Sequence, residues 1–217
     1  MMDYTGMSLG LLKGLGVSAE LFFLTLLFAL PLGLAIAFGR LSSNPVVRQV
    51  LRIYISVMRG TPLMLQLLFI YFGPYYIFRV SLSGYSPLVG AVVAFSLNYA
   101  AYFAEIYRAG IESIDHGQYE AASSLGIGKA RTFVSVIFPQ VLKRILPPVT
   151  NEVITLVKDT SLAFTLSVME MFTVAKMAAA AHTTMVPLIA AGVFYYIFNY
   201  LVAWAMERLE RHFSYYN

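Results

Sequence analysis

The amino-acid sequence predicts an all-α integral membrane protein in which five transmembrane helices form a single domain over residues 1–217. Hydrophobic residues make up 59% of the chain and charged residues only 12%, about half of the roughly 25% that soluble domains carry. Mean hydropathy is +0.72. A soluble domain of this size would lack the polar surface to cover itself, and the low charge also excludes a disordered chain or a coiled coil. The lack of cysteine excludes a disulfide scaffold and a thiolate metal site.

Apolar stretches of sufficient length define the five spans. A helix needs about 20 residues to cross the roughly 30 Å hydrocarbon layer of a bilayer. The expected spans are residues 17–38, 54–78, 88–107, 147–168 and 186–206. The span 147–168 carries Glu152, Lys158 and Asp159, so its charges require an explanation. Ahead of the first span, residues 6–16 predict a short interfacial helix, and Pro31 within that span predicts a kink.

Basic residues gather in the segments that the five spans leave on one side of the membrane. Ten lie in the first loop, the loop of residues 108–146 and the C-terminal tail, against three on the opposite side. The ten are Arg40, Arg48, Arg52, Arg108, Lys129, Arg131, Lys143, Arg144, Arg208 and Arg211. Cytoplasmic segments of membrane proteins carry the excess of Lys and Arg, which predicts an outside N-terminus and a cytoplasmic C-terminus. The net charge of +4 therefore indicates a lipid bilayer as partner and not nucleic acid.

The long cytoplasmic loop contains the signals of one short helix. Asp115 is a favourable N-cap, and Gly126 can end the helix in a left-handed conformation. Between them, Tyr119, Ala122 and Ser123 recur at helical spacing on the face that Gly126 completes. A helix of this length is not stable alone. It fits docking into a groove of a partner protein or, equally, an ordinary surface helix between two spans.

The loop also carries a family resemblance. Glu120-Ala121-Ala122, followed by Gly126 and then by Ile137 and Pro139, resembles the EAA loop of permease subunits in binding-protein-dependent ABC importers. Flanking patches are similar to the polar amino-acid branch, which imports histidine, arginine, glutamine or glutamate. These patches are Arg59-Gly-Thr-Pro62 with Gln66, residues 98–105, Gly117-Gln118, Pro139-Gln140, Leu146-Pro-Pro148, Asn151-Glu152 and residues 158–162. The resemblance extends from about Val17 to the C-terminus.

The resemblance implies a multi-subunit importer in a bacterial-type inner (cell) membrane. Its partners would be a second permease subunit, with a homodimer favoured, two cytoplasmic ATPase subunits and an extracytoplasmic amino-acid-binding protein. In that family the EAA loop, here about residues 108–140, forms the coupling helix that contacts the ATPase. The residues that would make this contact are Gln118, Glu120, Ala121, Ala122 and Gly126.

The chain is expected to be a non-catalytic transport subunit. A P-loop needs Gly, four residues, then Gly-Lys-Ser/Thr, and the run Gly126-Ile-Gly128-Lys129-Ala130 lacks both the earlier glycine and the hydroxyl. ATP and Mg are therefore expected on the partner ATPase, with no cofactor bound by this chain. His116, His182 and His212 lie too far apart in sequence to predict a metal site.

Polar residues within the spans fall on two helical faces. Asn98, Tyr102 and Glu105 follow an i, i+4, i+7 spacing, while Glu152, Thr155 and Asp159 follow i, i+3, i+7. A charged group at mid-membrane costs about 2.5–3.5 kcal/mol on insertion scales and therefore faces the bundle interior or a wet cavity. The predicted substrate pathway comprises Asn98, Tyr102, Glu105, Glu152, Thr155, Lys158, Asp159, Ser161 and Glu170.

Two alternatives accompany the pathway hypothesis. Glu105, Glu152 and Asp159 could instead pair with Arg59, Lys158 and Arg108 and hold the helices together. Residues 158–161 could also break the helix, as in transporters with discontinuous helices. The carboxylates favour a cationic substrate (arginine, lysine or histidine) over glutamine or glutamate. An ion-coupled secondary transporter, which would also use buried carboxylates, is the rival class of protein.

Overall fold

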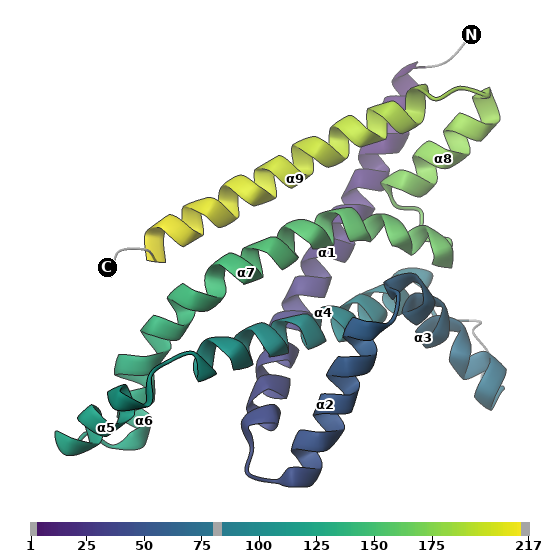
Figure 1. Ribbon diagram of the computed structural model, residues 1–217. Helices are drawn as coiled ribbons and strands as arrows, with labels where there is room; N and C mark the ends of the chain where they lie inside the picture. The colour runs from purple at the N-terminus through teal and green to yellow at the C-terminus, as the bar shows by residue number, and fades with distance from the viewer. Residues whose placement is uncertain (1–3, 80–83, 214–217) are drawn as a thin grey trace.

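The computed structural model describes residues 4–79 and 84–213, and every regular element in these ranges is a helix (Figure 1). The prediction of an all-α protein is thereby confirmed. In chain order the elements are α1 (Tyr4–Leu41), α2 (Pro45–Gly60), α3 (Leu63–Phe78), α4 (Pro87–Glu112), α5 (His116–Ser124), α6 (Lys129–Thr132), the π-helix η1 (Phe133–Ile137), α7 (Phe138–Asp159), the 3₁₀ helix η2 (Thr160–Leu166), α8 (Met171–His182) and α9 (Val186–Phe213).

Three of these helices, α1, α4 and α9, are long and apolar enough to cross a membrane. Two bent pairs, α2 with α3 and the Lys129–Leu166 run with α8, raise the number of candidate spans to five if each pair counts as one. Helix α1 is one continuous helix of 38 residues that passes through Pro31. The separate interfacial helix predicted for residues 6–16 is therefore wrong: these residues form the first turns of α1, since no breaker separates them from the apolar run.

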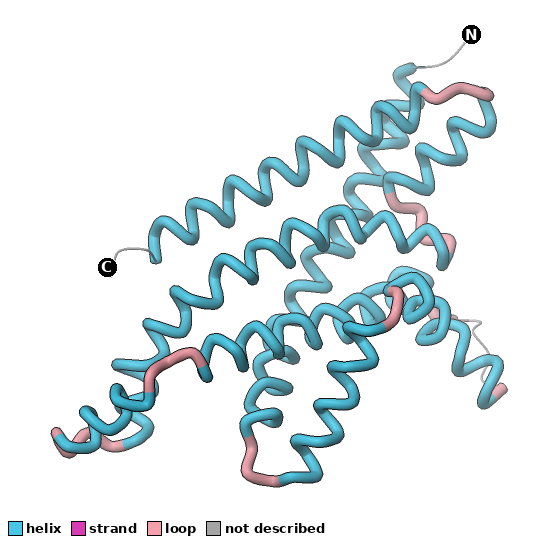
Figure 2. The backbone as a smooth tube through the Cα atoms, in the orientation of Figure 1, coloured by secondary structure: helices cyan, strands magenta, loops and turns pink. Residues whose placement is uncertain are grey.

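The second predicted span, 54–78, is wrong as a single helix. The chain turns by 115° between α2 and α3, across the short loop that Figure 2 draws in pink between them. Pro62 has no N–H to continue the α2 ladder, and it holds Thr61 in an extended conformation (φ −121°, ψ 150°). The apolar length of 54–78 thus contains the end of one helix and all of another.

The fourth predicted span also differs from a simple helix. Helix α7 begins at Phe138 rather than near Pro147, ends at Asp159 and changes into the 3₁₀ helix η2. The suspected break at residues 158–161 is thus a change of helix type. Ser167 then adopts a left-handed conformation (φ 59°), and α8 leaves at 58° to the preceding run. Helix α8 was not predicted from the sequence.

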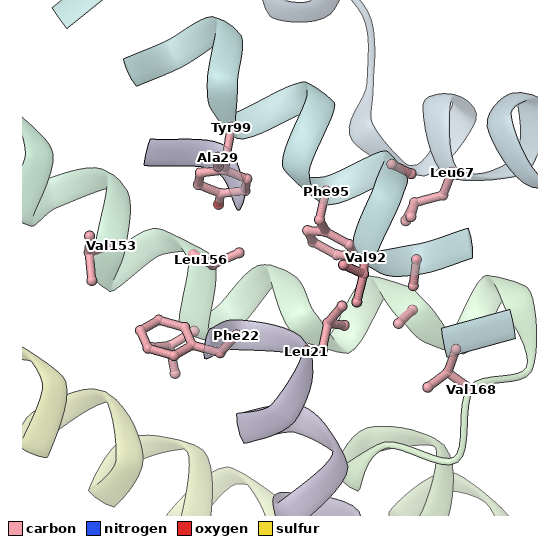
Figure 3. Packing of buried hydrophobic residues seen from close by; sticks show 14 of the residues in the cluster. Leu21, Phe22, Ala29, Leu67, Val92, Phe95, Tyr99, Val153, Leu156 and Val168 are labelled. Atoms are coloured by element: carbon pink, nitrogen blue, oxygen red, sulfur yellow. The ribbon is translucent and has the colours of Figure 1, made fainter. Parts of the chain in front are cut away.

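The main core lies where α1, α4 and α7 pack together (Figure 3). Phe22 of α1, Phe95 and Tyr99 of α4 and Leu156 of α7 are buried there, each with at most 2% of its surface exposed. Close approach of α1 and α4 requires glycine at position 33. A Cβ there would lie 2.8 Å from the Cβ of Phe103, closer than atoms tolerate. This contact fixes α4, and with it the polar face of α4, against the rest of the bundle.

Candidate functional site

A cleft of about 460 Å³, with a mainly apolar wall and several charged side chains, lies between the C-terminal half of α4, the middle of α7 and the C-terminal end of α2. Its charged and aromatic lining is Arg59, Tyr102, Glu105, Arg144 and Glu152, and the remaining lining residues are Ile106, Ala109, Gly110, Ser113 and Pro148. Three of the nine predicted pathway residues, Tyr102, Glu105 and Glu152, therefore meet in one cleft.

The sequence analysis placed Arg59 in a patch of the family resemblance and in a possible ion pair, and Arg144 in the basic loop, and it predicted neither as a pathway residue. Arg59 is the last side chain of α2, and its guanidinium carbon lies 5.3 Å from the centre of the Tyr102 ring, a cation–π contact. Arg144 reaches across to α4, where its Nη1 donates to the Ser113 hydroxyl at 2.9 Å. Neither position follows from local sequence, because each depends on how α2 and α7 pack against α4.

The two carboxylates of the cleft differ in their partners. Arg108, one turn along α4, pairs with Glu105 and also with Glu112, and its Nε donates to Glu105 Oε1 at 3.0 Å. Glu152 forms no ion pair with any described residue, and it interacts with the charge of Arg59 at longer range. Of the ion pairs proposed for Glu105, Glu152 and Asp159, only that of Glu105 with Arg108 is therefore present among the described residues. Glu152 is the carboxylate available to a bound cation.

Both signs of charge thus surround one cavity. The guanidinium of Arg59 can hold a carboxylate, and the carboxylates of Glu152 and Glu105 can accept hydrogen bonds from an ammonium group. A free amino acid carries these two complementary groups on one carbon atom. The arrangement therefore has the chemistry to bind an amino acid, and it carries no nucleophile and base pair for catalysis.

A second polar contact lies further along α7, two turns from Glu152. The Tyr99 hydroxyl of α4 donates to Asp159 Oδ2 at 2.8 Å. Asp159 is half-buried and takes no part in lining the cleft. Thr155 and Ser161 donate their hydroxyl protons to backbone carbonyls of α7, and Lys158 is exposed. Only Thr155 and Asp159 share the α7 row of Glu152, and none of the four lines the cleft.

Asn98, on α4, is hydrogen-bonded to the bend between α2 and α3. Its Nδ2 donates to Gln66 Oε1 at 2.9 Å and to the Met58 carbonyl at 3.1 Å. Gln66 Nε2 in turn donates to the Met58 carbonyl at 2.9 Å and to the Thr61 carbonyl at 3.0 Å. Carbonyls freed by the end of α2 are thereby satisfied within the protein, as the membrane interior requires. Asn98 is 4% exposed and does not line the cleft.

Glu170 occupies a closed environment of its own. It is fully buried and caps α8: its carboxylate accepts from the backbone N–H groups of Phe172 (2.6 Å) and Thr173 (2.7 Å). It also accepts from the Thr173 hydroxyl at 2.7 Å and the Tyr195 hydroxyl at 2.9 Å. Next to it, the Met171 N–H donates to the Ser18 hydroxyl of α1 at 3.2 Å. The carboxylate has four donors and no exposed surface.

The coupling-loop helix forms where the sequence predicts it. Helix α5 is capped by Asp115, whose side chain accepts from the Gly117 N–H, and Gly126 adopts a left-handed conformation (φ +73°). Gln118, Glu120, Ala121 and Gly126 are exposed, and so is the side chain of Leu125, by 78%. Ala122 is buried, and Tyr119 packs on a small core with Ile114, Ile137 and Val141. The face that holds Tyr119 and Ala122 therefore turns toward the chain itself.

Comparison with known proteins identifies the family of this chain. Residues 29–215 match the family described as binding-protein-dependent transport system inner membrane component. The chain belongs to this family. The resemblance recognised in the EAA loop is thus confirmed, and the ion-coupled secondary transporter loses its support. Members are multi-pass proteins of the inner membrane and non-catalytic transport components, and the family implies a partner permease, ATPase subunits and a binding protein.

Individual relatives are named as transport proteins for particular amino acids. The L-cystine transport system permease protein TcyB of Bacillus subtilis is 38% identical over 91% of this chain and 84% of its own length. The arginine transport system permease protein ArtQ of the same organism is 35% identical over 93% of this chain and 91% of its own. A crystal structure of an amino acid ABC transporter with histidines contains a chain that superposes with a TM-score of 0.87. It is 32% identical, and the alignment covers 98% of this chain and 99% of that one. This chain is accordingly an amino-acid ABC importer permease.

Proposed function

We propose that the chain moves cationic amino acids (arginine, lysine or histidine) into the cell through the cleft between α2, α4 and α7. The observation that carries this proposal is the meeting of Glu152, Glu105 and Arg59 around one cavity. Two carboxylates and two guanidiniums line the cleft, but Glu105 is paired with Arg108 and Arg144 is bonded to Ser113. Arg59 is thus left for the carboxylate of a substrate and Glu152 for a cationic group. A relative named for arginine and a related structure with histidines support the same class.

Each residue of the cleft has a proposed role. Arg59 binds the α-carboxylate, Glu152 binds the α-ammonium or side-chain cation, and Tyr102 orients Arg59 through its ring. Glu105, which is already paired with Arg108, adds negative charge to the α4 side of the cleft. Thr155 and Asp159 continue the Glu152 face of α7 beyond the cleft. Together with Lys158 and Ser161, which project at other angles around the axis, they form the proposed approach to the cleft, whereas Asn98 and Glu170 are structural.

Competition in proteoliposomes tests the substrate class. The complex of permease, ATPase and binding protein takes up radiolabelled arginine, and each unlabelled amino acid is added in turn. We expect lysine or histidine to compete more strongly than glutamine, glutamate or cystine. Equal or stronger competition by glutamine or glutamate would assign the same machinery to a neutral or acidic substrate. Because the binding protein also selects, the assay includes variants of Glu152, whose effect isolates the contribution of the cleft.

Energy enters, we propose, through α5. Gln118, Glu120, Ala121 and Gly126 lie on the exposed side of this helix and would contact the ATPase, while Ala122 is buried on its opposite side. ATP and Mg would bind only to the two ATPase subunits.

We propose that a second copy of this chain supplies the other half of the substrate path. Co-purification of this permease as the sole membrane subunit with the ATPase would support the homodimer, and a second, different permease in the complex would contradict it.

The proposed topology has the N-terminus outside and the C-terminus in the cytoplasm. In Figure 1 the N-terminus and the connection between α8 and α9 lie at one end of the molecule, and the α1–α2 turn and α5 lie at the opposite end. The chain has no cysteine, so single substitutions need no altered background. Ser43→Cys should react with an impermeant thiol reagent only from the cytoplasmic side and His182→Cys only from outside. Labelling of both from one side would contradict the topology.

A further inference from the structure

Helix α2 presents three faces of different chemistry. Leu51, Tyr54, Ile55 and Met58 pack inward. Val46, Val50, Ile53 and Val57 form an exposed apolar row, each with more than half of its surface exposed. The third face carries Arg48, Arg52 and Arg59, all exposed and, at 100° per residue, within an arc of about 40° around the helix axis.

The arginine face cannot lie against hydrocarbon. Helix α2 is the first half of a bent candidate span, and Arg59 follows Pro45 by about 21 Å along the helix axis at 1.5 Å per residue. Charged side chains at such depth face a water-filled cavity or a polar partner, because lipid tails cannot solvate them. The valine and isoleucine row offers the surface that lipid or an apolar partner would cover. The arginine row is therefore the face of α2 that contacts water or a polar partner.

No carboxylate of the described residues forms an ion pair with any of the three arginines. The ion pairs near them involve Arg108, which pairs with both Glu105 and Glu112 of α4 and offsets one of their two negative charges. At the N-terminal end of α2, Arg40 turns its Nη1 to the Arg48 carbonyl at 3.3 Å and adds a fourth cation. The row thus has a surplus of positive charge that the chain itself does not compensate.

The row starts at the cleft. Arg59 lines the cleft beside Glu152, Arg52 follows about 10 Å further along the axis, and Arg48 follows after another 6 Å or so. The shorter step lies within the Debye length of about 8 Å at physiological salt and the longer step lies slightly beyond it, so an anionic group that leaves one guanidinium still feels a partly screened attraction to the next. The row ends at the α1–α2 turn, on the proposed cytoplasmic side.

We propose that Arg52 and Arg48 form an exit row that receives the α-carboxylate of the amino acid after Arg59 and guides it to the cytoplasm. The proposal rests on the transport function proposed above and extends it to residues outside the cleft. Its distinguishing feature is that these arginines act on substrate release. They should influence the turnover of transport and leave the apparent affinity and the ATPase reaction largely intact.

The test compares uptake by proteoliposomes that contain the complete importer with wild-type permease or with the double variant Arg48→Gln/Arg52→Gln. We expect kcat for uptake to fall about tenfold, as for the loss of one charged hydrogen bond to the moving carboxylate. KM should stay within about twofold, and ATP hydrolysis stimulated by the binding protein should persist, so that fewer molecules enter per ATP. Arg48→Lys/Arg52→Lys, which keeps both charges, should recover most of the rate.

Arg208→Gln is the control, since Arg208 is also an exposed arginine on a candidate spanning helix but lies on α9 against Trp204, away from the cleft lining. It should transport at the wild-type rate. Unchanged kcat in the double glutamine variant would overturn the exit row. So would a defect that appears only in vesicles with anionic phospholipid, because it would assign the arginines to lipid headgroups. Glu152→Gln, measured in parallel, reports on the cleft itself, so failure of the cleft and failure of the exit row give different results.

Discussion

Two carboxylates, Glu152 on α7 and Glu170 at the start of α8, illustrate how one residue type serves two purposes inside a membrane protein. Glu170 is fully buried and accepts four hydrogen bonds from its own chain. Glu152 is half-buried, lines a cleft and has no ion-pair partner among the described residues. The sequence places both within or beside an apolar stretch. The two differ in the number of hydrogen-bond donors that surround them. A carboxylate whose oxygens already accept four hydrogen bonds has little capacity left to bind a ligand.

The largest expected effect on stability is at Glu170. Glu170→Ala removes the cap of α8 and leaves the Tyr195 hydroxyl buried without its acceptor, which should lower the free energy of unfolding by about 3 kcal/mol. Glu170→Gln keeps one acceptor oxygen and should lose less. Thermal unfolding of the detergent-solubilised complex measures both. If a variant unfolds like wild type but transports with an altered KM, Glu170 belongs to the substrate pathway, and the contrast with Glu152 is wrong.

Asn98 provides a second buried polar group of the structural kind. Asn98→Ala deletes its bonds to Gln66 and to the Met58 carbonyl, and we expect a loss of about 2 kcal/mol, because Gln66 is left with an unpaired buried oxygen. The same thermal assay checks this. Apparent substrate affinity of the folded fraction should be unchanged. A large rise in KM without loss of stability would mean that Asn98 contacts the substrate.

Glu152 should behave in the opposite manner. Glu152→Gln keeps the shape of the side chain and removes its charge, so KM for uptake should rise about tenfold, equivalent to about 1.4 kcal/mol. The free energy of unfolding should change by no more than about 0.5 kcal/mol. Glu207→Gln is the control, because Glu207 is exposed and paired with Arg211 at the far end of α9. Equal kinetics for the two variants would remove Glu152 from the binding site.

A further effect, on the coupling of ATP use to transport, is expected at Gly126, which lies outside both carboxylate sites. Its φ of +73° is unfavourable for any residue with a Cβ, so Gly126→Ala should cost about 1 kcal/mol and disturb the end of α5. Gly128→Ala is a matched control: its φ is −64°, and neither glycine has atoms within 4 Å of an added Cβ. We expect fewer molecules transported per ATP for Gly126→Ala alone. Identical coupling in both variants would contradict a role for the α5 terminus.

Features set by nearby residues were predictable. The cap at Asp115, the left-handed end at Gly126 and the apolar run of α4 each depend on a few adjacent positions, and all three are present. The bend at Thr61 also had a local signal in Pro62, but hydrophobic length outweighed it in the prediction. Helix α8 was missed because its cap is Glu170, a residue type not among the preferred N-caps, and because its first turn is held by contacts with α1 and α9.

The composition of the cleft was predictable only in part. The spacing of Tyr102 and Glu105 placed them on one face of α4, and Glu152 followed from the face of α7. Whether these faces meet depends on the packing of α4 on α7, which is close at Gly110 beside Ile145. Arg59 joins them only because α2 packs on α4, beside Tyr102. Likewise, spacing aligned Glu152 with Asp159 but could not tell which one has a bound partner, since Tyr99 lies on another helix.

Thiol accessibility tests the central contrast most directly. Glu152→Cys and Glu170→Cys are made separately in the naturally cysteine-free chain, and the folded complexes react with a hydrophilic thiol reagent with and without saturating arginine. The account predicts that the cysteine at position 152 reacts and that arginine slows the reaction, while the cysteine at position 170 stays unreacted. Equal reaction at the two positions, or a rate at position 152 that no amino acid changes, would contradict it.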